Sequence, residues 1–329
     1  MSQGWAVQAS AQRLCGALLM LVLCAALVTE GNSAETTTSE PRLDALQLTM
    51  PQLGHKKRIW IYLPPHYDRS SHTRYPVLYM QDGQDLFDTA DRSSSDPYML
   101  ESLRRQLREL LGWYGSWRVE HSLDRLIATQ QLDALIVVGV SSDGDDRTTQ
   151  YSPWAWAGAS VPKGEAYVEF LVHTLKPYID RHYRTFSGRD HTAIAGSSLG
   201  GLIALYAGMK HQETFSRVAA LSPLLTPQAL GAPLVDYVLR RGKSHPMRIY
   251  VDLGTSEQSF GPLDPLRGAL RAAGFAEQEL VFRYVVGGEH RIDHWRQRFP
   301  EVMRWLYGHD SDDPRYAFTV SPLLPAAER

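Results

Sequence analysis

The sequence predicts an α/β fold: a mainly parallel eight-stranded sheet with helices on both faces. Three observations lead to this prediction. Strand-like and helix-like segments alternate along most of the chain, several strand-like runs are continuously apolar, and no internal repeat interrupts the alternation. Alternating strands and helices are typical of a parallel sheet. Continuous apolar runs are typical of strands buried on both faces.

Each predicted strand follows from its local pattern. Residues 43–50 and 58–63 alternate apolar with polar side chains and are expected to begin the sheet as an antiparallel pair. Pro64 and Pro65 end the second of these strands. Further β-rich runs predict the remaining strands, at 75–80, 134–140, 191–195, 217–221, 248–253 and 280–286.

The predicted helices lie between these strands. Residues 164–178 are amphipathic at helical spacing, and Pro177 is expected to end or kink that helix. The connection 222–246 follows the sixth strand and is too short for a large lid domain, so an open cleft is expected. The other predicted helices are at 99–111, 119–129, 199–209, 265–273 and 294–306.

The composition is that of a soluble globular protein. Hydrophobic residues make up 43% of the 329 residues and charged residues 21%. The formal net charge is −2, with 36 acidic and 34 basic residues, so the basic excess typical of a nucleic-acid-binding protein is missing from the sequence. We therefore expect no nucleic-acid partner.

The N-terminal segment resembles an export signal. Arg13 precedes an apolar run at 14–28, which is shorter than the about 20 residues of a comfortable membrane span. We predict a signal peptide over 1–34, a linker over 35–42, a single α/β domain over 43–310 and a tail over 311–329. Cys15 and Cys24, the two cysteines of the chain, both lie in the predicted signal. The mature protein is thus expected to be periplasmic or secreted, to have no thiol and not to remain in the membrane. A retained signal anchor is the alternative.

One motif indicates a catalytic nucleophile. Gly196-Ser197-Ser198-Leu199-Gly200 fits G-x-S-x-G and lies between a predicted strand and a predicted helix. In the α/β-hydrolase fold this tight turn, the nucleophile elbow, exposes a serine at a helix N-terminus, where backbone N–H groups and the helix dipole favour a developing oxyanion. Glycines two residues to either side avoid a collision with the turn. Ser198 is the predicted nucleophile, because Ser197 has Ala195 in place of the first glycine.

A serine needs a neighbouring base, and in this fold the histidine follows the last strand. His290 follows Gly287 and Gly288 directly after that strand, and is the predicted general base. His294 is the alternative, in the first turn of the final predicted helix, and His309 is a further candidate.

The triad acid is expected after the seventh strand, where it would orient the imidazole and stabilise its charged form. Glu257 follows the turn Gly254-Thr255-Ser256 and is the predicted acid. Asp252 is the rival, although it lies within the strand, and Asp264 is a more distant candidate.

The four-residue spacing of His290 and His294 also fits a metal site on one helix face. The motif lacks the glutamate of H-E-x-x-H, and His290 is expected to precede the helix. We predict no metal ion and no organic cofactor.

Longer segments extend this pattern to a family. The elbow GSSLGG, YPVLYMQDGQDLFD, IVVGVSSDGDDRTTQYSPW, YVDLGTSEQ and GGEHRIDHW together resemble the putative esterase family of α/β-hydrolases, over about residues 43–307. That family includes feruloyl and acetylxylan esterases, S-formylglutathione hydrolases, enterochelin-type siderophore esterases and mycolyltransferases. The resemblance is specific for the family but not for one substrate.

The resemblance implies the triad Ser198, His290 and Glu257. Many members have Asn or Asp after the histidine, where this chain has Arg291. The resemblance also implies an oxyanion hole made by the N–H of Leu199 and a second donor in Asp82-Gly83-Gln84, of which Gln84 N–H fits best. Each such donor is worth about two to three orders of magnitude in rate.

Three further residues are candidate substrate contacts, in the region after the fourth strand. Trp154 and Trp156 could stack on a sugar or an aromatic acid, and core packing is the alternative. Arg147 could contact an anionic group, or could be an ordinary surface residue.

The expected function is two-step hydrolysis of a small-molecule or carbohydrate-linked carboxylic ester through an acyl-enzyme. The alternatives are a ferric-siderophore trilactone esterase and an acyltransferase, which share the triad. A non-catalytic binding protein of the same fold is a further alternative, disfavoured by the intact Ser, His and acid.

Overall fold

A computed structural model of the chain describes residues 42–67, 72–88, 115–142 and 146–308. All of them belong to one compact unit, Ser39–Arg329. The predicted signal peptide, the predicted helix 99–111 and the tail 311–329 lie outside the described residues, as does the linker apart from Arg42.

The strands form one eight-stranded sheet in the order β1-β2-β4-β3-β5-β6-β7-β8. β2 pairs in the antiparallel direction with both β1 and β4, and the other pairings are parallel. The predicted mainly parallel sheet is confirmed. The bounds are β1 Arg42–Met50, β2 His55–Leu63, β3 Val77–Gln81, β4 Ile136–Val140, β5 Thr192–Ser197, β6 Arg217–Leu221, β7 Arg248–Gly254 and β8 Leu280–Val285.

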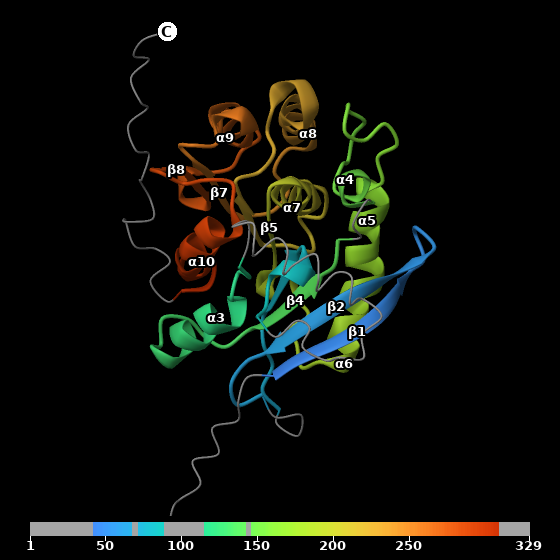
Figure 1. Ribbon diagram of the computed structural model, residues 1–329, viewed down its shortest axis with the longest axis vertical. Helices are drawn as coiled ribbons and strands as arrows, with labels where there is room; N and C mark the ends of the chain where they lie inside the picture. Colours follow the sequence, from blue (N-terminus) through green and yellow to red (C-terminus); the bar gives the residue numbers. More distant parts are fainter. Residues whose placement is uncertain (1–41, 68–71, 89–114, 143–145, 309–329) are drawn as a thin grey trace, which may run out of the picture. The chain divides into compact units, whose positions relative to one another are not determined.

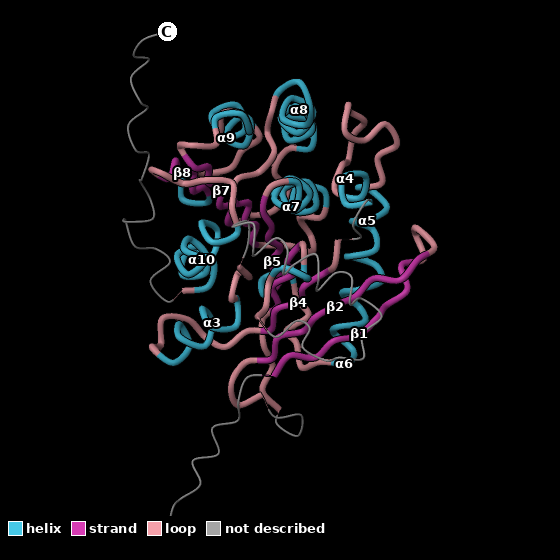
Figure 2. The backbone as a smooth tube through the Cα atoms, viewed as in Figure 1, coloured by secondary structure: helices cyan, strands magenta, loops and turns pink. Residues whose placement is uncertain are grey.

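Helices cover both faces of the sheet (Figures 1 and 2). One apolar core contains α3 and α10, and the other contains α5 to α9. The central strands β3, β4 and β5 are buried along their whole length, as the apolar runs of β3 and β4 predicted for those two strands. The helices are α3 Val119–Ala128, α4 Arg147–Gln150, α5 Gly164–Phe170, α6 Lys176–His182, α7 Leu199–Lys210, α8 Ala232–Arg241, α9 Asp264–Ala272 and α10 Ile292–Tyr307.

The structure has helical features that the sequence analysis did not predict, among them the short helix α4. The predicted helix 164–178 continues to His182, and a π-helical turn, Leu171–Leu175, separates α5 from α6. Pro177 lies in the first turn of α6, where a missing N–H costs little. The helix therefore does not end at Pro177, and only its hydrogen-bond pattern changes before that residue. The connection after β6 contains α8, which was not predicted, and the described residues include no lid domain.

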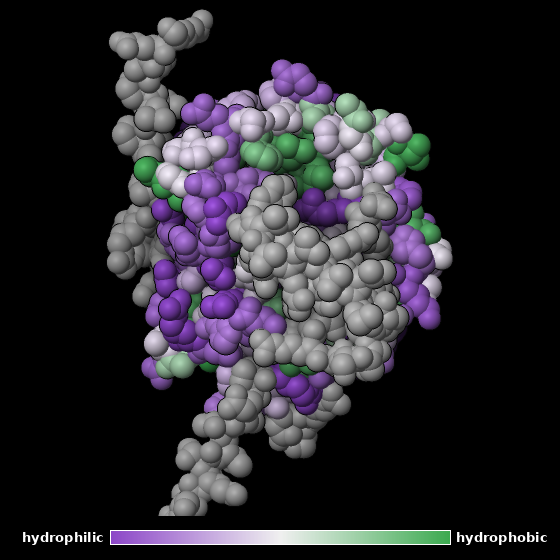
Figure 3. Space-filling model, in the orientation of Figure 1, coloured by the Kyte–Doolittle hydropathy of each residue, from purple (hydrophilic) through white to green (hydrophobic). Residues whose placement is uncertain are grey.

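No helix within the described ranges has the length and apolar character needed to cross a membrane. The described part of the face in Figure 3 is largely hydrophilic, with smaller apolar patches.

Candidate active site

Ser198 occupies the sharp turn between β5 and α7. Its backbone has φ 57° and ψ −128°, a conformation that non-glycine residues rarely adopt. Backbone hydrogen bonds hold the turn: Ser198 N–H donates to Leu221 O over 3.0 Å, and Gly201 N–H donates to Ser198 O over 3.1 Å. Such strain costs about 1–3 kcal/mol and persists where the surrounding structure enforces it, often at functional sites.

The two glycines of the motif make this turn sterically feasible. A Cβ atom at Gly196 would lie 2.4 Å from Gly200 O, which is a backbone atom that cannot easily move away. A Cβ atom at Gly200 would lie 3.0 Å from Asp82 Oδ2 and 3.0 Å from Gln81 Cβ, which is a tight contact with side chains. The elbow therefore needs glycine most at Gly196.

We expect Gly196→Ala to destabilise the fold more than Gly200→Ala does. Overpacking against fixed backbone costs about 1–3 kcal/mol, whereas the side chains near Gly200 can shift. Urea unfolding of both variants measures the difference as a change in midpoint at constant slope. Equal losses in the two variants would show that the elbow relaxes freely.

His290 lies against the nucleophile. Its Nε2 is 2.9 Å from Ser198 Oγ, which is hydrogen-bonding distance. The loops that follow β7 and β8 are joined, because Ser256 N–H donates to Gly288 O over 3.1 Å and Gly254 has no Cβ that would clash with Gly288. This junction brings the loop of the acid beside the loop of the base.

Glu257 completes the arrangement. Its Oε1 lies 3.5 Å from His290 Nδ1, and its Oε2 accepts a 2.7 Å hydrogen bond from Gly254 N–H. The side chain is 1% exposed. Burial opposes ionisation, but the polar surroundings of the carboxylate, chiefly His290, outweigh burial and hold the pKa of Glu257 below its ordinary value. Glu257 is thus an anion beside the imidazole.

Two aromatic rings hold His290 in place. Phe260 stacks on the imidazole with centroids 3.8 Å apart and planes 10° apart, and Trp295 meets it edge-on at 4.9 Å. Phe260 lies three residues after Glu257, and Trp295 lies in α10. These two contacts restrict the orientation of the imidazole, whose two nitrogens face Ser198 and Glu257.

The alternative residues have other roles in the structure. Asp252 is fully buried, accepts a hydrogen bond from Tyr250 and lies 3.1 Å from Arg298 Nη1. Burial raises its pKa to about 6 despite the charge of Arg298. His294 Nδ1 lies 3.1 Å from the backbone N–H of Glu289, which donates to it. Asp264 is exposed at the start of α9, and His309 lies outside the described residues.

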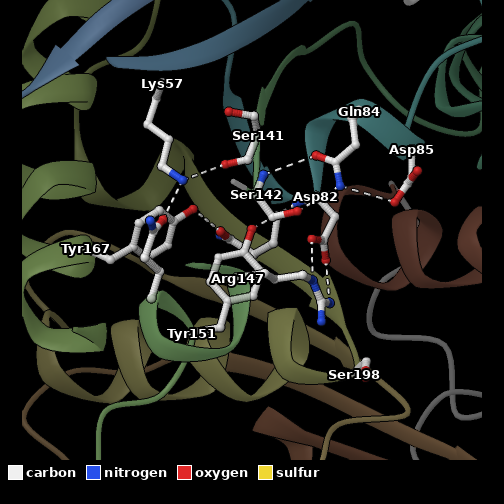
Figure 4. A network of polar contacts seen from close by, with 12 residues as sticks. Lys57, Asp82, Gln84, Asp85, Ser141, Ser142, Arg147, Tyr151, Tyr167 and Ser198 are labelled. Carbon is white, nitrogen blue, oxygen red and sulfur yellow. Dashed lines mark hydrogen bonds and ion pairs between the residues drawn. The ribbon is translucent and has the colours of Figure 1, made fainter. Parts of the chain in front are cut away.

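Arg147 and Asp82 are paired beside the elbow (Figure 4). Arg147 Nε and Nη2 donate to the two carboxylate oxygens of Asp82 at 2.7 and 2.8 Å. Asp82 has φ 58°, in the left-handed region, and its N–H donates to Tyr151 Oη at 3.1 Å. Burial raises the pKa of Asp82, but Arg147 more than offsets this and holds the pKa below its usual value.

The same loop is anchored at Gln84, the predicted source of an oxyanion donor. Its side chain donates to Ser142 Oγ at 2.8 Å and accepts from Ser142 N–H at 3.1 Å. Gly83 packs so closely on Gly139 and Trp60 that an added Cβ would lie 2.6 Å from Gly139 C. Leu199 is the first residue of α7, and the N–H group of a first helical residue has no carbonyl acceptor within its helix. Both predicted donor positions thus lie in ordered backbone.

We expect Asp82→Asn to lower kcat about tenfold with little change in KM. The substitution preserves the shape of the side chain but removes the charge that orders the Gln84 loop, and an oxyanion donor is worth about 10²–10³ in rate. Steady-state kinetics on p-nitrophenyl acetate provides the measurement. Asp44→Asn, which removes the exposed ion pair with Arg42 on β1, is the matched control. Equal kinetics for the two variants would refute the effect.

The two tryptophans are held by contacts within the chain. Trp154 packs against Tyr206 and Tyr237, with centroids 5.3 and 5.7 Å away. Trp156 Nε1 donates to Ser152 Oγ at 2.9 Å. Both side chains are half-buried, so these contacts leave part of each ring exposed. Stacking of a substrate on either ring stays a prediction.

One group within the described ranges has the spacing of metal ligands. Asp88, Glu120 and His121 place one ligand atom each within 4.8 Å of one another. Asp88 Oδ2 already lies 3.0 Å from Arg118 Nε. Glu120 and His121 lie in α3 and Asp88 lies three residues after the short helix Gly83–Asp85, and no step at Ser198 requires the group.

Sequence reasoning missed Phe260, Trp295 and Ser222. Aromatic residues near the triad have no fixed spacing from it, and only the fold shows that they meet at His290. Ser222 could have been noticed, because it directly follows β6 at the carboxyl edge of the sheet, where α/β folds place ligand sites.

Comparison with known proteins identifies the class of this fold and site. The family model described as "Putative esterase" matches residues 51–306. The chain belongs to this family and is a carboxylic-ester hydrolase, as the sequence motifs predicted. An uncharacterized protein, YbbA, of Bacillus subtilis strain 168 is 22% identical over 267 residues, which are 77% of this chain and 93% of that protein. An endo-1,4-beta-xylanase/feruloyl esterase of Xylanibacter ruminicola is 24% identical over 75% of this chain and 29% of its own length.

Solved structures share the fold. A ferulic acid esterase superposes with a TM-score of 0.58 and 21% identity, over 82% of this chain and 98% of its own. The enterobactin esterase of Shigella flexneri gives a TM-score of 0.60 and 19% identity, over 82% of this chain and 60% of its own. These similarities confirm the α/β-hydrolase type of fold.

Proposed function

We propose that the protein hydrolyses carboxylic esters through an acyl-enzyme, with Ser198 as nucleophile, His290 as general base and Glu257 as the acid that orients the base. The observation that carries this proposal is the continuous line of contacts from Ser198 Oγ to His290 Nε2 at 2.9 Å and from His290 Nδ1 to the buried Glu257 at 3.5 Å. Contacts of this kind often tighten only when substrate binds.

In the proposed first step Ser198 Oγ attacks the ester carbonyl carbon while its proton passes to His290 Nε2. The oxyanion accepts hydrogen bonds from Leu199 N–H and Gln84 N–H. The C–O bond to the alcohol then breaks, and the alcohol leaves with the proton from His290. In the second step His290 deprotonates a water molecule, which attacks the acyl group and releases the acid and Ser198.

Trapping of the acyl-enzyme tests the proposal. p-Nitrophenyl acetate is mixed with the protein and the reaction is quenched with acid within one turnover. Intact mass spectrometry should then show one acetyl group, and peptide mapping should place it on Ser198. Acetyl on another residue, or turnover without any adduct under conditions where deacylation is slow, would contradict the proposal.

The natural ester is proposed to be a small-molecule or carbohydrate-linked carboxylic ester. The support is the family membership and the names of the similar proteins, which include ferulic acid esterases and an enterobactin esterase. Relative kcat/KM on a feruloyl ester, an acetylated xylo-oligosaccharide and a catecholate trilactone ranks these substrate types. Added alcohol that takes up the acyl group faster than water would indicate an acyltransferase.

Export to the periplasm or medium is proposed on the basis of the apolar run 14–28 and the polar residues that follow it. N-terminal sequencing of the protein recovered from its native host should begin near Glu35. A mature chain that still contains Arg13 would contradict this proposal.

A further inference from the structure

Phe260 stacks on the proposed general base at close range. Its ring and the His290 imidazole have centroids 3.8 Å apart and planes 10° apart. Two neutral aromatic rings prefer an offset or edge-on arrangement, with centroids about 4.5–7 Å apart. The close and nearly parallel stack of Phe260 on His290 therefore calls for a further source of attraction.

A positive charge on the imidazole supplies this attraction. The face of an aromatic ring is electron-rich and attracts a cation that lies within about 6 Å of the ring centroid. In the proposed first step His290 Nε2, which is 2.9 Å from Ser198 Oγ, takes the serine proton, so the imidazole becomes a cation. Glu257 approaches this cation at Nδ1, in the ring edge, at 3.5 Å, whereas Phe260 covers the ring face. The two contacts therefore act on the same charge from different directions.

Main-chain hydrogen bonds connect Phe260 to the nucleophile elbow. Leu225 N–H donates to Phe260 O over 2.8 Å, and Leu224 N–H donates to Ser198 O over 3.3 Å. Gly261 permits the close approach to Leu225, because its φ is 92° and an added Cβ atom would lie 2.3 Å from Leu225 O. The short segment after β6 thus holds the backbone of Phe260 in a fixed position relative to the backbone of Ser198.

We propose that Phe260 is a positioning residue for ester hydrolysis: its ring holds the plane of the His290 imidazole, and its electron-rich face stabilises the imidazolium that forms when Ser198 attacks. This inference rests on the proposed function. The effect falls on kcat, because the attraction is stronger once His290 is charged than while it is neutral. An aliphatic side chain of similar size would pack against the imidazole without this stabilisation.

Replacement of Phe260 by trifluorophenylalanine tests the electron-rich face directly, because fluorine withdraws electrons from the ring and changes its size little. We expect kcat on p-nitrophenyl acetate, measured on the alkaline plateau of the pH profile, to fall about fivefold, with KM changed less than about twofold. An unchanged kcat in the fluorinated protein would overturn the proposal. An increase in KM alone would assign Phe260 to substrate contact and would also overturn it.

Two ordinary substitutions bracket this result. Phe260→Leu removes the ring and should lower kcat about tenfold, whereas Phe260→Tyr keeps the ring and should stay within about twofold of wild type. Equal losses in the leucine and tyrosine variants would show that only the shape of the side chain matters, and would overturn the proposal. If Phe260→Leu does not fold, the fluorinated protein, which keeps the shape of the ring, decides the question.

A double-mutant cycle with His290→Ala decides whether Phe260 acts through the base. We expect Phe260→Leu to have no further effect on the residual kcat of the His290→Ala variant, which the oxyanion donors sustain. Equal fold-losses in both backgrounds would assign Phe260 a purely structural role and overturn this proposal alone. A wild-type kcat for His290→Ala would overturn the proposed triad and the role of Phe260 together.

Discussion

Ser198→Ala is expected to reduce kcat/KM for p-nitrophenyl acetate by roughly 10⁴–10⁶-fold, because the variant lacks the hydroxyl that is proposed to form the acyl bond. Alanine and serine both have a Cβ atom, so alanine adds no steric strain to the turn at Ser198, and the fold should be retained. Residual turnover would come from binding and the oxyanion donors alone.

The neighbouring Ser197→Ala is the matched control. Ser197 is the last residue of β5, is buried, and directly precedes the partly exposed Ser198. We expect it to retain activity within a few-fold of wild type. If Ser197→Ala loses activity and Ser198→Ala keeps it, the nucleophile has been assigned to the wrong serine.

His290→Ala should be as damaging as Ser198→Ala, because an unassisted serine hydroxyl is a poor nucleophile. The two substitutions should not be additive: the Ser198→Ala/His290→Ala double variant should be no slower than either single variant, as expected of groups that act as a unit. Steady-state rates of the three variants measure this.

His294→Gln is the control for a histidine in the same region. Its Nδ1 accepts a hydrogen bond from the Glu289 backbone, a role that the glutamine side-chain oxygen can fill. We expect nearly wild-type rates. A larger loss from His294→Gln than from His290→Ala would mean that the base is His294.

The fold could be predicted because its signals are local. The apolar runs of β3 and β4 indicate strands buried on both faces, and the G-x-S-x-G turn places a strand before Ser198 and a helix after it. α8 was missed although its sequence, APLVDYVLRR, is amphipathic, because the segment was considered only as part of the connection after the sixth strand. The π-helical turn before Pro177 was not predicted, because helical periodicity does not encode a local change in the backbone hydrogen-bond pattern.

The part of the candidate site that could be predicted is the part whose residues follow directly after a strand. His290 and Glu257 follow the last two strands of the sheet, and parallel strands bring their carboxyl ends to one edge. The choice between Glu257 and Asp252 needed three-dimensional contacts, since only the structure shows Arg298 and Tyr250 beside Asp252. The pairing of Arg147 with Asp82 could not be read from the sequence, because 65 positions separate them.

Labelling with a fluorophosphonate tests the central claim most directly, because the reagent reacts with a serine hydroxyl that a neighbouring base has activated. The full chain and its Ser198→Ala variant are incubated with the reagent, and intact mass and peptide mapping locate the adduct. The account predicts one phosphonyl group per chain, on Ser198, with none on the variant. An adduct on another residue, equal labelling of the variant, or an unlabelled wild-type protein that still turns over p-nitrophenyl acetate would contradict it.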